Sequence, residues 1–107
     1  NSVAYPKLNV KIAGSHGGLS VGEDGPTHQA CEDLAIMRDI PNMLVCCPCD
    51  GNEMRAAVEQ LLHYDGPAYL RLGRSKMPNF TEENQEFVIK GGFAEQHDNT
   101  LIVCAEL

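Results

Sequence analysis

The amino-acid sequence predicts an α/β fold with a mainly parallel sheet and helices on both of its faces. Strand-like and helix-like patterns alternate over the first 74 residues, which is typical of a parallel sheet with helical crossovers. A continuous apolar run at residues 43–47 has the pattern of a strand that is covered on both sides. A glycine-rich loop follows the first strand, at the sheet edge where open α/β folds bind their ligands.

Strands and helices are expected in turn along this part of the chain. Apolar and polar residues alternate over residues 9–13, so a strand is predicted there. Apolar residues at helical spacing predict a helix that begins at about Thr27 and is closed by Ile40 and Pro41. The apolar run at residues 43–47 is the second strand. The strands at residues 9–13, 43–47 and 68–72 should be parallel and joined by right-handed crossovers through one helix each.

The second helix has a clear start signal. Asp50, with Glu53 three residues later, has the spacing of a capping box, and apolar residues then recur at helical spacing. A turn at residues 65–67 ends this helix, and residues 68–72 form the third predicted strand. The next stretch is polar, contains Pro78 and is predicted to be a linker. The expected regions are an α/β domain at 1–74, the linker at 75–85 and the start of a second α/β domain at 86–107.

Two further strands are expected in the last region, at residues 86–89 and 100–105, on either side of a turn at Gly91 and Gly92. The length of 107 residues suits one domain or part of one, and 43% hydrophobic with 21% charged residues excludes a disordered chain. No apolar stretch approaches the length of a membrane span. The net charge of −7 argues against a nucleic-acid partner. The chain begins at Asn1 without a secretion signal, so we expect a trimmed part of a longer cytoplasmic protein.

The five cysteines suggest neither a disulfide framework nor a zinc site. Cys46, Cys47 and Cys49 lie close together in an apolar run, whereas Cys31 and Cys104 are distant from them. A disulfide framework would have an even number of cysteines and a secretion signal. A zinc site would have two spaced pairs of ligands. We therefore expect buried, reduced thiols in a reducing compartment.

The loop at residues 15–29 holds the candidate binding residues. His16, Asp24 and His28, together with free backbone amides, are suited to a polyhydroxylated, anionic ligand. The alternative is that Asp24 and Thr27 cap the following helix and that both histidines are solvated.

An arginine at the end of the third strand is the second candidate. Arg74 follows a glycine there and can present two parallel N–H donors to a phosphate. The alternative is a surface arginine paired with a nearby acid. Arg71 lies within the strand and is interpreted as an edge or ion-pair residue.

Several motifs then identify a family. The segments GEDGPTHQ at residues 22–29, EDLA at 32–35 and LRLGR at 70–74 closely resemble the pyrimidine-binding domain of transketolases. The resemblance covers about residues 3–80, as the second half of that domain, and is strongest to the carboxyl-terminal subunits of transketolases split over two chains. Residues 86–107 resemble, more weakly, the start of the family's carboxyl-terminal domain.

The resemblance implies a transferase of carbohydrate metabolism, in the pentose phosphate pathway. Transketolases move a two-carbon ketol unit from a ketose phosphate to an aldose phosphate, with thiamine diphosphate and a divalent cation such as Mg²⁺ or Ca²⁺. By this resemblance, Asp24 bonds a substrate hydroxyl near the transferred carbons and His28 meets the C1 hydroxyl and carbonyl of the donor, so both are expected catalytic residues. His16 and Arg74 hold the substrate phosphate.

The resemblance also implies an incomplete site. In the family, a glutamate activates the pyrimidine ring of the cofactor, and aromatic residues stack on that ring. These residues belong to a segment upstream of the position that corresponds to Asn1. We therefore expect no cofactor-binding or metal-binding residue in this chain, and no activity without a subunit or domain that carries the pyrophosphate-binding half. A dimer or other homo-oligomer is expected. Gly73, and the Gly17-Gly18 pair, depart from the family's pattern, so substrate preference is less well defined than the reaction. The alternatives are a deoxyxylulose phosphate synthase fragment and a non-catalytic assembly module of the same fold.

Overall fold

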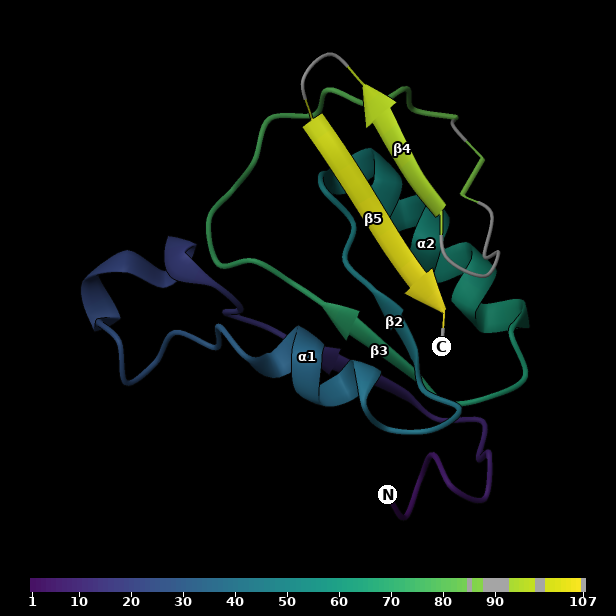
Figure 1. The fold of residues 1–107 in the computed structure, drawn as a ribbon. Coiled ribbons are helices and arrows are strands. Elements are labelled where there is room, and N and C mark those ends of the chain that lie inside the picture. Colours follow the sequence, from purple (N-terminus) through teal and green to yellow (C-terminus); the bar gives the residue numbers. More distant parts are fainter. Residues whose placement is uncertain (85, 88–92, 98–99, 107) are drawn as a thin grey trace.

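The structure is a computed structural model of the chain, and it describes residues 1–84, 86–87, 93–97 and 100–106, the last two ranges for their backbone. Within these residues the chain forms a single mixed sheet with helices packed on it (Figure 1). The helices are α1 (Asp33–Arg38), α2 (Gly51–His63) and the short 3₁₀ helix η1 (Leu19–Asp24). The strands are β1 (Lys11–Gly14), β2 (Leu44–Cys46), β3 (Ala68–Arg71), β4 (Phe93–His97) and β5 (Thr100–Glu106).

The first three strands are parallel, as predicted. The strand order is β1-β3-β2-β5-β4, and β3 pairs in parallel with both β1 and β2. Tyr69 of β3 lies opposite Ile12 on one side and Val45 on the other. Helix α1 connects β1 to β2, and α2 connects β2 to β3. The predicted α/β fold is therefore confirmed, and the carboxyl ends of β1, β2 and β3 meet at one edge of the sheet.

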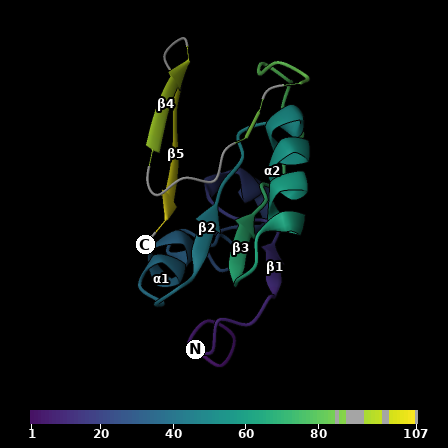
Figure 2. The ribbon, with the colours of Figure 1, turned by 90° about the vertical axis from the view of Figure 1, so that its right-hand side faces the viewer.

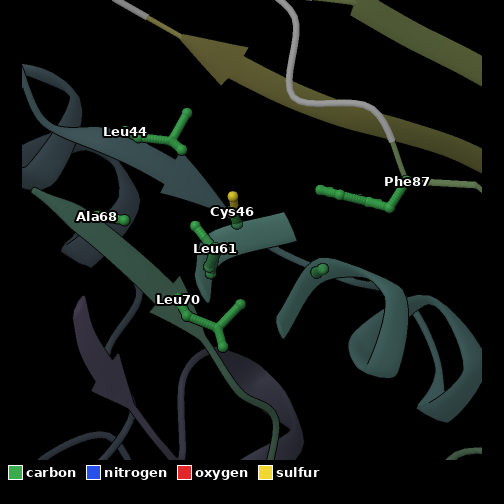
Figure 3. Close-up of a cluster of buried hydrophobic side chains, with 7 residues drawn as sticks. Leu44, Cys46, Leu61, Ala68, Leu70 and Phe87 are labelled. Carbon is green, nitrogen blue, oxygen red and sulfur yellow. The ribbon is translucent and has the colours of Figure 1, made fainter. Parts of the chain in front are cut away.

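The two helices cover opposite faces of the parallel strands (Figure 2). Because successive side chains of a strand point to opposite faces, β3 contributes Leu70 to one core and Tyr69 to the other. The core on the α2 side is shown in Figure 3 and consists of Leu44, Cys46, Ala57, Leu61, Ala68, Leu70 and Phe87. The core on the α1 side is built from Ala4, Met43, Val45 and Tyr69, with Ile12, Leu34, Met37 and Ile40 packed against them.

Helix α1 begins later than the sequence pattern predicts. It starts at Asp33, with Glu32 at its N-cap, rather than at about Thr27. Ala30 instead pairs with Gly17 in an isolated parallel bridge, which holds the backbone extended immediately before the helix. The alternative in which Asp24 and Thr27 cap this helix is therefore wrong.

The region after β3 has no helix or strand over residues 72–84. The strand predicted at residues 100–105 is confirmed as β5, which pairs antiparallel with β2 and with β4. The structure places Glu86 and Phe87 outside any strand, and residues 88–89 and the Gly91-Gly92 turn lie outside the described residues. The domain boundaries at 74 and 86 stay predictions. Among the described helices, none combines the length and apolar character that crossing a bilayer requires.

Candidate functional site

The loop between β1 and α1 carries three of the four predicted site residues. It leaves the sheet after Gly14, passes through η1 and returns at Ala30, beyond the carboxyl end of β3 at the left of Figure 1. Gly22 and Gly25 have φ angles of 66° and 75°, a left-handed region that glycine adopts without the steric cost of a Cβ atom. These glycines let the chain reverse direction and so present polar side chains at the edge of the sheet.

Arg74 and Asp24 lie together at this edge. The Nη1 atom of Arg74 is 3.2 Å from Oδ2 of Asp24 and also donates to the backbone carbonyl of Val21, at 2.6 Å. Its Nη2 atom donates to Oε1 of Glu23 at 2.7 Å. The structure thus brings together two predicted site residues that are far apart in the sequence. It also shows that Arg74 has acidic partners, as the alternative interpretation proposed.

The two histidines lie on the exposed part of the same loop. Nδ1 of His16 is 3.1 Å from the hydroxyl of Ser15, and Nδ1 of His28 is 2.9 Å from the hydroxyl of Thr27. Within the described residues, neither ring forms a hydrogen bond or ion pair with Asp24 or Arg74. The structure therefore places all four predicted residues on one loop and the adjoining strand end, but joins only Asp24 and Arg74 directly.

Arg71 is an ion-pair residue, as one of its two interpretations proposed, and the edge interpretation is wrong because β3 lies between β1 and β2. Its Nε atom lies 3.2 Å from Oδ2 of Asp33, and its Nη2 atom donates to the carbonyl of Ala30 at 2.9 Å. Tyr69 donates its hydroxyl to the same Asp33 oxygen at 2.7 Å. Burial, and then the hydrogen bond to Asp33, raise the pKa of Tyr69 to about 12, so this hydroxyl stays protonated and donates.

Sequence analysis did not identify Asp33 as part of this network. Its one signal is the charge of Arg71 inside an otherwise apolar strand, because a cation there requires a buried acceptor. The partner itself is 38 positions away, and only the packing of α1 on β3 identifies it.

A cavity of about 550 Å³ adjoins the same strand ends. Arg71 and Gly17 line it on the side of the loop, Cys47 and Cys49 on the side of β2, and Lys76 on the side of the linker. None of His16, Asp24, His28 and Arg74 lines it, so the cavity lies beside the candidate site rather than within it.

The expectation of buried thiols is confirmed for Cys46, whereas Cys47 and Cys49 are half-buried and Cys31 is exposed, so it is wrong for Cys31. Cys31, Cys46, Cys47 and Cys49 form no disulfide in the described part of the chain. Burial, followed by the hydrogen bond and charge of Glu53, raises the pKa of Cys49 to about 12, so its thiol is protonated near neutral pH. A protonated thiol is a poor nucleophile and metal ligand, which favours a structural role for Cys49.

Comparison with known proteins gives the family. The profile of "Transketolase, pyrimidine binding domain" matches residues 1–79. A putative transketolase C-terminal section of Methanocaldococcus jannaschii is 43% identical, over 99% of this chain and 35% of that protein. A 1-deoxy-D-xylulose-5-phosphate synthase of Stutzerimonas stutzeri is 46% identical, over 78% of this chain and 13% of that protein. A solved structure described as "Split gene transketolase, inactive beta4 tetramer" is 45% identical, has a TM-score of 0.73 and covers 88% of this chain and 29% of its own.

The chain spans about a third of the M. jannaschii protein and a smaller share of the other two. Fold, profile and sequence identity nevertheless agree over most of its residues. The resemblance inferred from the GEDGPTHQ and LRLGR segments is therefore confirmed, and the chain belongs to the transketolase family, in which it matches the pyrimidine-binding domain.

Proposed function

We propose that this chain is part of a thiamine-diphosphate-dependent transketolase that transfers a two-carbon ketol unit between ketose and aldose phosphates. In this proposal the chain contributes substrate contacts: Asp24 and His28 to the sugar near the transferred carbons, and His16 and Arg74 to its phosphate. The observation that carries the proposal is the 3.2 Å contact between Arg74 and Asp24 at the carboxyl edge of the parallel strands. This contact joins the loop to the end of β3, and it therefore supports a single cleft that the proposed substrate residues share.

The residue types fit the proposed ligand. A carboxylate such as Asp24 accepts hydrogen bonds from sugar hydroxyls, and a neutral imidazole such as His28 can donate or accept. The guanidinium of Arg74 matches the geometry of a phosphate. Glu23, which occupies one side of that guanidinium, has a side chain that is 80% exposed. It can therefore turn into solvent when a phosphate takes its place.

Thiamine diphosphate would be held mainly outside this chain. Among the described residues, no three His, Cys, Asp or Glu side chains lie close enough to hold a divalent cation. We propose that a partner subunit or domain supplies the pyrophosphate-binding half. The solved relative described as an inactive β4 tetramer supports this requirement.

The proposal is tested by Arg74→Met in the parent chain, assembled with the chain that carries the pyrophosphate-binding half. Loss of the charge-assisted hydrogen bonds should raise KM about 10- to 150-fold for phosphorylated donors, which corresponds to roughly 1.5–3 kcal/mol. Unphosphorylated ketoses should be affected much less. The matched control is Arg55→Met, an exposed arginine 4.0 Å from Glu83, which should leave both substrate classes unchanged. Equal losses for both classes with Arg74→Met would contradict the phosphate role.

A deoxyxylulose phosphate synthase is the second candidate, because the S. stutzeri synthase is 46% identical over 78% of the chain. The assembled protein separates the two: formation of 1-deoxy-D-xylulose 5-phosphate would support the synthase, and ketol transfer between sugar phosphates would support the transketolase. An assembly that catalyses neither reaction would favour a non-catalytic module of the same fold.

A further inference from the structure

The loop that carries the proposed substrate contacts is closed at a narrow neck. Gly17 and Ala30 form a parallel bridge, and the amide of Gly18 donates to the carbonyl of Ala30 at 2.8 Å. The amide of Gly17 donates to the carbonyl of Leu72, just after β3, at 3.1 Å. The neck is thus formed by both ends of the loop and is attached to the strand end that leads to Arg74.

Arg71 is fixed at the neck. Its Nη2 atom donates to the carbonyl of Ala30, the acceptor that Gly18 also uses. Its ion pair with Asp33 is largely buried, since the two side chains are only 18% and 12% exposed. A pair shielded from water in this way is screened weakly by salt. Tyr69, which bonds the same carboxylate, further restricts where that carboxylate can lie.

The two glycines of the neck fit around this arginine. A Cβ atom added to Gly17 would lie 2.3 Å from Nε of Arg71, and one added to Gly18 would lie 2.9 Å from Nη2. Gly17 does not have a positive φ angle, so the close approach of Arg71 is the feature that requires a glycine there. This accounts for Gly17, whereas Gly18 also has a φ angle of 84°, which favours glycine independently of Arg71.

We propose that Arg71 is a positioning residue that fastens both ends of this loop to β3 and so holds His16, Asp24 and His28 in register with Arg74. Arg71 fixes the neck, and Arg74 holds the far part of the loop through Val21 and Asp24. The significance of the register for catalysis depends on the proposed function, but the fastening does not, because it depends only on contacts within the chain.

The test is hydrogen exchange of the backbone amides in the parent chain, carried out without substrate. Arg71→Met should make the amide of Gly18 and its neighbours in the loop exchange about 10-fold faster or more, since the shared acceptor at Ala30 is no longer held. The amides of α2, which lies on the other face of the sheet, should keep their rates. Gly17→Ala keeps Arg71 in the sequence but forces its side chain away from the neck, so it should give the same local pattern.

The double variant of Arg71→Met and Gly17→Ala adds a second criterion. If both changes act through one contact, the double variant should exchange little faster than Arg71→Met alone. Fully additive effects would overturn the proposal, and so would loop amides that keep their rates in both single variants. Acceleration in α2 equal to that in the loop, in both single variants, would show a general loss of stability and would also overturn it. Arg55→Met is the control and should leave the loop amides unchanged.

Kinetics of the assembled enzyme separate a positioning role of Arg71 from direct binding of the substrate phosphate. Arg71→Met should lower kcat/KM by a similar factor for phosphorylated and unphosphorylated ketoses, because it displaces the whole loop, whereas Arg74→Met should discriminate between them. A selective loss of phosphorylated substrates with Arg71→Met would overturn the positioning role in favour of direct phosphate binding. Absence of ketol transfer in the unmutated assembly, together with the expected exchange pattern, would refute the proposed function and leave the fastening by Arg71 established.

Discussion

At the scale of single residues, Arg74 contacts two acids that differ in exposure. Asp24 is 44% exposed and Glu23 is 80% exposed, and both lie within 3.2 Å of the guanidinium. An exposed carboxylate gains little from such a pair, because water and salt screen it. A phosphate would therefore displace Glu23 more readily than Asp24.

This difference predicts that Glu23→Gln strengthens the binding of phosphorylated sugars. Removing the competing charge should lower KM for these substrates roughly 2- to 5-fold, in line with about 0.5–1 kcal/mol for an exposed pair. Steady-state kinetics of the assembled enzyme measure this change in KM. Glu83→Gln, which removes a 78% exposed acid 4.0 Å from Arg55, is the matched control. A higher KM in Glu23→Gln would mean that Glu23 contacts the substrate instead.

Residue types alone indicated part of this arrangement. His16, Asp24, His28 and Arg74 could be singled out because polar side chains at the carboxyl edge of parallel strands are candidates for ligand binding. The direct contact between Asp24 and Arg74, and the role of Asp33, could not be read from the sequence. They depend on how far the loop folds back on β3, which is decided by contacts between distant residues.

At the scale of elements, the first turn of α2 anchors the segment that follows β3. Asp50 is buried, and its carboxylate accepts the amide of Glu53, as in the predicted cap. It also accepts the amides of Phe80 and Thr81 and the hydroxyl of Thr81, all within 2.9 Å. The predicted linker is therefore attached to the helix.

The cap of α2 could be predicted because its residues are three positions apart, and it is confirmed. The attachment of Phe80 and Thr81 could not, because it joins groups about 30 residues apart and no local pattern marks it. The late start of α1 has the same origin: local spacing favours an earlier helix, but pairing with Gly17 keeps Ala30 extended.

The carboxylate of Asp50 should make the free energy of unfolding depend on pH. Burial alone would raise its pKa, but the hydrogen bonds from Glu53, Thr81 and Phe80 outweigh it and lower the pKa from 3.8 to about 2. Because folding lowers this pKa, the stabilisation is present above about pH 4 and is lost as the pH falls toward 2. It amounts to about 2 kcal/mol in the free energy of unfolding.

Denaturant unfolding at several pH values measures this contribution. Asp50→Asn should lower the free energy of unfolding by about 2 kcal/mol at pH 7, and it should remove the corresponding loss between pH 4 and 2. Asp39→Asn, which changes an exposed carboxylate after α1, is the control and should change little. An Asp50→Asn variant that is as stable as the unmutated chain at pH 7 would contradict the role of this anchor.

At the scale of the whole molecule, the parallel α/β core could be predicted from the sequence, but the arrangement of the carboxyl-terminal strands could be predicted less well. Strands 9–13, 43–47 and 68–72 were recognisable because period-two and continuous apolar patterns distinguish half-buried from buried strands. The antiparallel pairing of β5 with the edge of β2 was not, because the pattern of a strand does not identify its partner. The predicted second domain at 86–107 stays a prediction.

The isolated chain should bind thiamine diphosphate weakly and should not transfer ketol units. The substrate contacts proposed for it lie at the sheet edge, and its described residues include no cluster of three acidic, histidine or cysteine side chains for a divalent cation. Its net charge of −7 also disfavours a diphosphate that is not neutralised by a metal ion. Titration calorimetry with the cofactor and Mg²⁺ should therefore give a dissociation constant above about 1 µM, weaker than about −8 kcal/mol.

Adding the chain that carries the pyrophosphate-binding half is the control for this measurement. If the site is shared between two chains, the mixture should bind the cofactor more tightly than either chain does, since each supplies contacts that the other lacks. The gain should be smaller for a mixture made with Arg71→Met, if the loop at the shared edge also contacts the second chain. Submicromolar binding by the isolated chain would show instead that a cofactor site lies within these 107 residues, and the division of the site proposed above would be wrong.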